Sequence, residues 1–199
     1  MIALDVETTG WYPVSRYSLL SIGALDYDNH KNSFYGECRA WLGAAIDKKA
    51  LDINGFTEAE ITRIDRKSLQ ELMKEFLAWT KNIEDVTLIG HNPFLELHYL
   101  NISLERSKIP GIFGRRMVDL HTIAYTSFRL SNLKIPLENK SSGLSLDEIL
   151  KYTGLPAEPI PHRALVGAKM EAEAFSRLVY KKNLLKEFKK YKLPDFLKE

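Results

Sequence analysis

The order of strand-like and helix-like segments restricts the fold of this chain more than any other feature. Strand-forming residues fill the runs 2–6, 17–27 and 33–41, and short polar stretches separate these runs. After residue 68 the apolar residues follow helical spacing, interrupted by short strand-like stretches at 86–90 and 117–119. An antiparallel meander followed by alternating helices and strands predicts one α/β domain on a mixed sheet.

The spacing predicts helices at 69–80, where Ser68 is a suitable N-cap, from residue 94 onward, at 142–150 and at 164–180. Residues 129–143 are expected to form a long polar loop. We expect a single domain over 1–199, in which residues 181–199 form a basic helical tail. The lysines of that tail either form a solvated helix face or help to hold a phosphate backbone.

Composition sets wider limits. The chain has 45% hydrophobic residues, enough for a core, and its net charge of +2 is too small to identify a nucleic-acid-binding protein. Its single cysteine, Cys38, has no partner for an internal disulfide, which favours a reducing compartment. The sequence starts without a basic and apolar leader and contains no run of roughly 20 apolar residues. We therefore expect a cytoplasmic protein with no membrane partner.

Two acids in the first strand indicate chemistry. Asp5 and Glu7 are two residues apart, so their side chains share one face of the strand. Two carboxylates in an otherwise apolar strand cost free energy unless a cation neutralises them. Carboxylate oxygens are ligands that Mg²⁺ and Mn²⁺ prefer. The alternative is that one carboxylate caps the following turn and the other is solvated.

Four segments together carry a more specific pattern. They are LDVETTG at 4–10, ALDINGFT at 50–57, GHNPFLELHYL at 90–100 and PHRALVGA at 161–168. In this order they resemble the motifs of the DEDDh, or DnaQ-like, branch of the DEDD 3'-to-5' exonucleases. The resemblance implies a ribonuclease H-like fold, with a mixed five-stranded sheet flanked by helices. It also implies metal-dependent hydrolysis of phosphodiester bonds at 3' ends of DNA or RNA.

The resemblance assigns roles to individual residues. It implies two divalent cations, Mg²⁺ or Mn²⁺, with Asp5, Glu7 and Glu96 as ligands and His162 as general base. Contacts with the substrate are expected at four further positions, Thr8, Thr9, Trp11 and Asn92. For Trp11, stacking on a terminal base and packing within the loop are both open. His91 and Asn92 are interpreted first as turn and cap residues that orient the helix carrying Glu96.

The chain departs from the family pattern at two acids. Glu96 stands where the second motif has aspartate, and Gly167, which offers no ligand, stands where the third motif has aspartate. Glu171 lies one helical turn beyond Gly167 on nearly the same face of the helix. Its long side chain could reach back over Gly167 and serve as the metal ligand in its place. In the alternative, Glu171 only flanks the apolar stripe of that helix. Glu173 points to the opposite side and is a poor candidate.

These departures leave more than one function open. The first hypothesis is an active exonuclease, with activity reduced by Gly167, acting on single-stranded or frayed 3' ends. The second is a weak or inactive module that binds nucleic-acid ends with the same fold, and the third retains the fold for protein–protein recognition alone. The sequence leaves open DNA against RNA, whether Gly167 is natural or introduced, and whether the chain works alone, as a homodimer or as a subunit of a larger complex.

Overall fold

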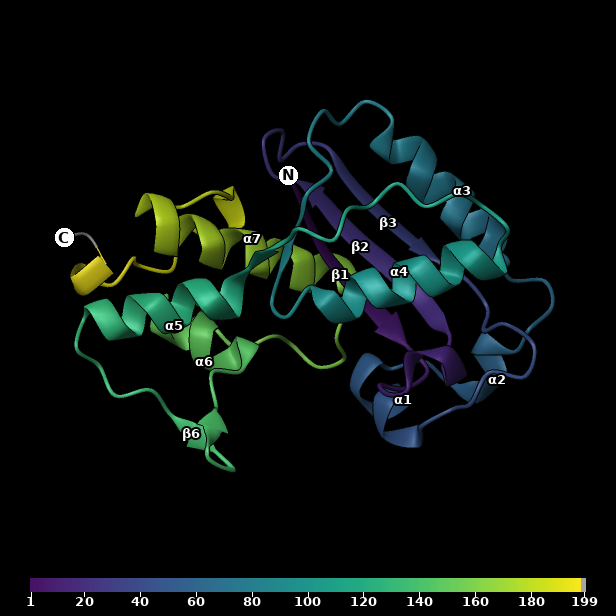
Figure 1. Cartoon of the computed structure of the whole chain (residues 1–199), viewed down its shortest axis with the longest axis horizontal. Coiled ribbons are helices and arrows are strands. Elements are labelled where there is room, and N and C mark those ends of the chain that lie inside the picture. The colour runs from purple at the N-terminus through teal and green to yellow at the C-terminus, as the bar shows by residue number, and fades with distance from the viewer. Residues whose placement is uncertain (198–199) are drawn as a thin grey trace.

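A five-stranded sheet forms the centre of the computed structural model of the chain, which describes residues 1–197. The strand order is β3-β2-β1-β4-β5. β1, β2 and β3 form an antiparallel meander (Figure 1), and β4 and β5 run parallel to β1. The bounds are Ile2–Thr8 for β1, Leu19–Asp26 for β2, Ser33–Glu37 for β3, Leu88–Gly90 for β4 and Val118–Asp119 for β5. The predicted mixed five-stranded sheet is therefore confirmed.

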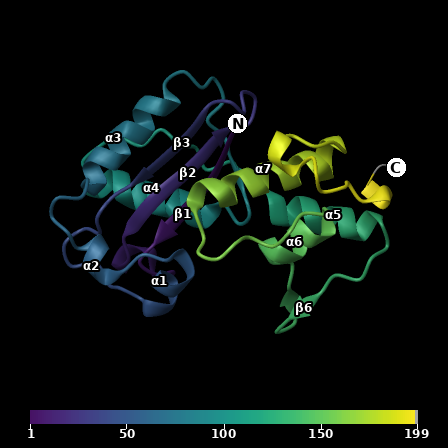
Figure 2. The ribbon, with the colours of Figure 1, turned by 180° about the vertical axis from the view of Figure 1, so that it is seen from behind.

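Helices cover both faces of the sheet. α3 (Leu69–Thr80) and α4 (Phe94–Arg106) lie on one face, and α7 (Ala164–Tyr180) crosses the other, with α5 (Leu120–Leu130) and α6 (Leu146–Tyr152) beside it (Figures 1 and 2). In β1, Ile2 and Leu4 pack in the α3–α4 core, whereas Ala3 packs in the α7 core. Because side chains alternate along a strand, Asp5 and Glu7 face the α7 side with Ala3.

A glycine in β2 lets α7 approach the sheet closely. Gly23 pairs with Asp5 in the β1–β2 register. A Cβ atom at Gly23 would overlap the backbone of Ala164 and Leu165, which form the first turn of α7. The absence of a side chain at Gly23 therefore positions the start of α7 directly beside Asp5.

The helix starts follow local capping rules. Ser68 caps α3 through a reciprocal capping box with Glu71, as predicted. Asp119 caps α5 by accepting hydrogen bonds from the backbone N–H groups of His121 and Thr122. α6 begins at Leu146 with Ser145 as N-cap, later than the helix start predicted at residue 142.

Several short elements are absent from the sequence prediction. α1 (Lys48–Asn54) and α2 (Glu58–Ile61) lie near the C-terminal end of β1, and η1 (Val14–Arg16) is a single 3₁₀ turn. α5 is also unpredicted. The segment 129–143 is not one long loop, because it contains the end of α5 and a hairpin of β6 (Leu137–Glu138) and β7 (Ser141–Ser142).

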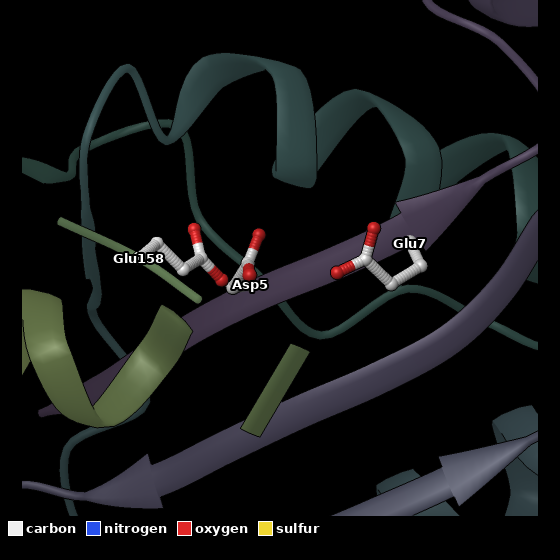
Figure 3. Close-up of side chains that lie close together, drawn as sticks. All are labelled: Asp5, Glu7 and Glu158. Carbon is white, nitrogen blue, oxygen red and sulfur yellow. The ribbon is translucent and has the colours of Figure 1, made fainter. Parts of the chain in front are cut away.

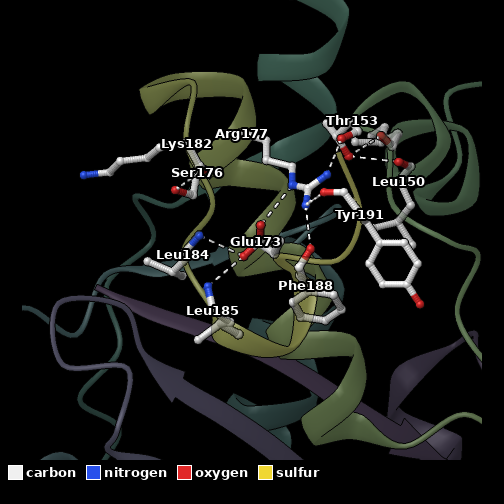
Figure 4. Close-up of polar contacts among 11 residues, drawn as sticks. Leu150, Thr153, Glu173, Ser176, Arg177, Lys182, Leu184, Leu185, Phe188 and Tyr191 are labelled. Carbon is white, nitrogen blue, oxygen red and sulfur yellow. Dashed lines mark hydrogen bonds and ion pairs between the residues drawn. The ribbon is translucent and has the colours of Figure 1, made fainter. Parts of the chain in front are cut away.

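The predicted helical tail is wrong for the residues that the structure describes. Between 181 and 197 the chain forms only two 3₁₀ turns, η2 (Lys186–Phe188) and η3 (Asp195–Leu197), and residues 198–199 of the predicted tail lie outside the described range. Side chains of α7 replace the helical hydrogen bonds of this segment (Figure 4). Glu173 accepts from the backbone N–H groups of Leu184 and Leu185, and the buried Arg177 donates to carbonyls at Thr153, Phe188 and Tyr191.

The tail folds back along α7, where Glu187 pairs with Lys169 at 3.1 Å. No helix within residues 1–197 is long and apolar enough to cross a membrane.

Candidate active site

A cavity of about 410 Å³ opens at the C-terminal end of β1. Its walls come from β1, α1, the first turns of α4 and α6, the loop before α7, and α7 itself. Five largely buried acids and two histidines line it: Asp5, Glu7, Glu96, Glu158, Glu171, His91 and His162. The structure therefore brings together every acid and base that the sequence analysis selected, and adds Glu158.

Asp5 and Glu7 form the floor of this cavity. Both project from the same face of β1, and Glu158 lies next to Asp5 (Figure 3). Asp5, Glu7 and Glu158 each offer one carboxylate oxygen, and the three oxygens lie within 4.8 Å of one another. Glu7 is only 8% exposed, so the alternative of a solvated carboxylate at the strand end is wrong.

Glu158 was missed by the sequence analysis. It lies in the irregular segment between α6 and α7, where its backbone N–H donates to Asp147 Oδ1 at 3.3 Å. Its side chain is 7% exposed, and its Oε2 lies 3.5 Å from Nδ1 of His162. A proline-rich segment without regular periodicity gave no reason to select this acid, and only the fold brings it beside Asp5.

Glu96 and Glu171 line the side of the cavity near β4. Glu171 Oε1 accepts a hydrogen bond of 3.0 Å from the backbone N–H of His91, which follows β4. Glu171 is only 5% exposed and lines the cavity, where the prediction of a metal ligand requires it to be, and that role stays a prediction. Glu173 lies on the opposite side of α7 and pairs with Arg177, as expected of a residue outside the site.

Burial raises the pKa of each of these acids. The pKa of Asp5 lies well above its ordinary value, first because of burial and then because of the charges of Glu171, Glu7, Glu158 and Glu96, in that order. Asp5 is thus the carboxylate that all the others influence. Burial raises the pKa of Glu96 to about 8.

The remaining acids show the same effect. Burial, and then the charge of Glu158, raises the pKa of Glu7 to about 8, opposed by Arg163. Burial, and then the charge of Asp147, raises the pKa of Glu158 to about 7. The pKa of Glu171 is raised well above its ordinary value by burial and by Glu96.

The donor set fits divalent cations. Within residues 1–197, no lysine or arginine forms an ion pair with any of the five acids, and Glu96 Oε2, Glu158 Oε1 and Glu171 Oε2 are buried without a hydrogen-bond donor. Buried acceptors without donors are costly unless a proton or a cation compensates them. Oxygen-only donors match Mg²⁺ or Mn²⁺ better than softer metals.

His162 lies at the edge of this acidic group. Its backbone N–H donates to the carbonyl of Ile53 at 2.9 Å, which ties the start of α7 to α1. Burial lowers the pKa of the ring, so His162 is neutral near pH 7 and able to accept a proton. The ring remains 33% exposed and lines the cavity.

His91 and Asn92 are turn residues, as predicted, but neither caps the helix, because the N-cap of α4 is Pro93. Asn92 has a positive φ of 55°, and its backbone N–H donates to Asp119 Oδ1. The His91 ring contacts the carbonyl of Leu144 through Nε2 at 3.0 Å. The turn that they form directs the first turn of α4, which carries Glu96, toward the cavity.

The predicted substrate contacts divide into two groups. Thr8, Trp11 and Asn92 line the cavity, and Trp11 is 62% exposed at its rim. Thr9 does not line it. The Thr9 side chain is fully buried and donates to the carbonyl of Ala45, so its expected contact with substrate is not supported.

Other residues that line the cavity belong to a segment that carries the family resemblance but received no predicted role. Ala50, Ile53 and Asn54 of α1 line the cavity, and they fall in the segment 50–57 that carries part of the family resemblance. Asn54 is 2% exposed and donates through its side chain to the carbonyl of Thr8. The resemblance in segment 50–57 could therefore have predicted that these residues form one wall of the cavity.

The mixed sheet covered on both faces, with an acidic cavity at the end of its central strand, defines a ribonuclease H-like domain. Solved structures agree. The nuclease domain of 3'hExo, a DEDDh family member bound to rAMP, aligns with a TM-score of 0.69 and 16% identity over 93% of this chain and 94% of that chain. Cell-death related nuclease 4 (CRN-4) gives a TM-score of 0.70 and 17% identity over 92% of this chain and 64% of that chain.

E. coli Exonuclease I in complex with a dA16 oligonucleotide gives a TM-score of 0.67 and 15% identity over 91% of this chain and 40% of that chain. All three neighbours are nucleases and the first is a DEDDh family member, so the resemblance predicted from the motifs is confirmed at the level of the fold. No protein-family model matches the chain.

Two curated sequences are also similar. DNA polymerase III PolC-type from Streptococcus suis (strain 98HAH33) is 26% identical over 151 residues, which is 73% of this chain and 10% of the polymerase. The PolC-type polymerase from Streptococcus sanguinis (strain SK36) is 26% identical over 113 residues, which is 56% of this chain and 7% of the polymerase. The chain therefore spans a tenth or less of these relatives.

Proposed function

We propose that this chain is a metal-dependent 3'-to-5' exonuclease that hydrolyses phosphodiester bonds at the 3' ends of DNA or RNA. The observation that carries the proposal is the group of five largely buried acids beside a neutral histidine in one cavity. The fold of known DEDDh exonucleases supports the same reaction. Cys38, which is free and buried, is consistent with the reducing, cytoplasmic location predicted from the sequence.

The acids divide into two groups around Asp5. Asp5, Glu7 and Glu158 form one close group, and Glu96 and Glu171 influence each other and Asp5. This division supports two cation positions that share Asp5 as a common ligand. Divalent cations bound there would polarise the scissile phosphate and lower the pKa of an attacking water.

His162 is the proposed general base. Its Nδ1 faces Glu158, which leaves Nε2 as the nitrogen available to accept a proton from the attacking water. The hydrogen bond from His162 N–H to Ile53 fixes the backbone position from which the ring projects. The lowered pKa of His162 keeps the ring unprotonated, as a base must be at neutral pH.

Three side chains at the cavity are proposed to hold the terminal nucleotide. Trp11 offers an exposed aromatic face on which a base can stack. Thr8 and Asn92 also line the cavity and offer polar groups. None of these groups distinguishes DNA from RNA.

An assay with single strands labelled at the 5' end tests the proposal. Digestion from the 3' end should give a ladder of shortened labelled products that requires Mg²⁺ or Mn²⁺ and disappears with EDTA. Asp5→Asn should abolish the ladder, and the exposed, distant Glu105→Gln should leave it unchanged.

Gly167 favours a second candidate, a module that grips nucleic-acid ends without cutting them. That reading gains if the purified chain binds single strands in the presence of Mn²⁺ but gives no shortened product under any metal condition. Absence of both binding and cleavage refutes both candidates.

A further inference from the structure

The position of Gly167 is the starting point. By family resemblance an aspartate belongs there, on the first turn of α7. A Cβ atom at Gly167 would overlap Asp5 Oδ2 and would lie 3.1 Å from Glu158 Oε1. The volume that a side chain at 167 would enter is therefore already taken by two carboxylates, one of which comes from outside the family motifs.

Glu158 reaches this volume from the loop that precedes α7. Its backbone N–H bonds to Asp147, and its side chain is 7% exposed. Its Oε1 is buried and has no hydrogen-bond donor anywhere in the described part of the chain. The contact of Oε2 with His162, at 3.5 Å, is long for a hydrogen bond. A buried, unpartnered oxygen that is aimed at Asp5 and Glu7 points to a ligand between them.

We propose that Glu158 occupies the ligand position that Gly167 leaves open, so that one divalent cation is held by Asp5, Glu7 and Glu158. This inference rests on the proposed function, because it identifies ligands of the cations that the reaction requires. The three oxygens lie within 4.8 Å of one another, which allows a single cation with oxygen ligands at about 2.0–2.6 Å to touch all of them.

Glu171 is less suited to this position. One of its oxygens already accepts the N–H of His91, and Glu171 is not among the three acids whose oxygens are mutually close. Its other oxygen lies near Gly90 on β4, where a Cβ atom would approach Glu171 Oε2 to 3.0 Å. Glu171 therefore serves the Glu96 side of the cavity, and Glu158 serves the Glu7 side.

Titration of the metal-free full-length chain with Mn²⁺, followed by calorimetry, tests the assignment. Glu158→Gln keeps the shape of the side chain but removes its charge, and it should weaken Mn²⁺ binding at one site by at least about 10-fold. Asp5→Asn should weaken it at least as much. Glu105→Gln makes the same chemical change on an exposed residue at the far end of α4, and it should bind Mn²⁺ like the unmodified chain.

His162→Asn separates a ligand from a positioning residue. If Glu158 only oriented His162, both His162→Asn and Glu158→Gln would lose cleavage and keep full Mn²⁺ affinity, and that result overturns the inference. Glu158→Gln removes an uncompensated buried charge, so its metal-free melting temperature should equal or exceed that of the unmodified chain. If Glu158→Gln binds Mn²⁺ as tightly as the unmodified chain while Asp5→Asn binds it more weakly, Glu158 is not a ligand and the proposed function still stands. If the unmodified chain takes up no Mn²⁺, the proposed function is refuted as well.

Discussion

Raising the pH from 7.0 to 8.5 in the absence of divalent cations is expected to lower the thermal stability of this protein. Glu7 and Glu96 each have a pKa raised to about 8, chiefly by burial. A group whose pKa is higher in the folded state holds its proton more tightly there than in the unfolded chain. Its contribution to stability is complete below the unfolded pKa near 4.5 and is lost as the pH rises through the folded value.

The size of the effect follows from these shifts. Between pH 7.0 and 8.5, each of the two groups loses about 1.3 kcal/mol of stabilisation, or about 2.5 kcal/mol together. For a domain of this size that corresponds to a fall in melting temperature of about 5–10 °C. His91 and His162 have pKa values lowered by burial, so their stabilisation is already present above pH 7 and does not change over the interval.

Differential scanning calorimetry in EDTA at the two pH values measures this fall. Glu7→Gln should remove close to half of it, because Glu96 and, to a smaller extent, Glu158 with its pKa of about 7 still titrate in this range. Glu138→Gln on the exposed β6 hairpin should leave the fall unchanged. Adding Mg²⁺ or Mn²⁺ should raise the melting temperature more at pH 8.5 than at pH 7.0, since cations favour the ionised acids. The prediction is refuted if the melting temperature in EDTA stays constant or rises between pH 7.0 and 8.5. It is also refuted if the melting temperature of Glu7→Gln falls as much as that of the unmodified chain.

Three further substitutions have distinct expected outcomes. His162→Asn should lower kcat by about 100- to 10,000-fold with little change in KM, measured by release of nucleotides from labelled strands; an unchanged kcat excludes His162 as the base. Trp11→Ala should raise KM for single strands roughly 10-fold or more at constant melting temperature, and an unchanged KM would mean that no base stacks there. Gly167→Asp should lower the metal-free melting temperature, because its Cβ overlaps Asp5 Oδ2, and an increase would contradict the crowding described for this position.

Elements with strong local signals were predictable from the sequence. Ser68 and Glu71 form a capping box that depends only on neighbouring residues, so the start of α3 was found correctly. The C-terminal segment was not, because Arg177 and Glu173 supply its hydrogen bonds from another element. No property local to residues 181–197 reveals that contribution. The lysine-rich composition favoured a helix, and the tertiary contacts determined the observed conformation.

The residues of the candidate site likewise divide into those with a signal in the sequence and those that only the fold brings together. Asp5, Glu7 and His162 lie in segments whose spacing carries the family resemblance, and the structure brings them to one cavity. Glu171 was selected by helical spacing alone, and its burial beside β4 depends on the contact with His91. Glu158 belongs to an irregular loop, and nothing in its neighbours along the chain indicates that it lies beside Asp5. Its position follows from the packing of α6 against α7.

The absence of an acid at position 167 does not by itself separate an enzyme from a binding module. With Glu158 and Glu171 beside Asp5, Glu7 and Glu96, the cavity still contains five largely buried acids, and no arginine or lysine pairs with them in the part of the chain that the structure describes. A phosphate backbone would be repelled by such a cavity unless cations were present. A module that only grips 3' ends here would therefore lose binding in EDTA just as an enzyme would. Sensitivity of binding to EDTA cannot distinguish the two functions, and the appearance of shortened strands must decide between them.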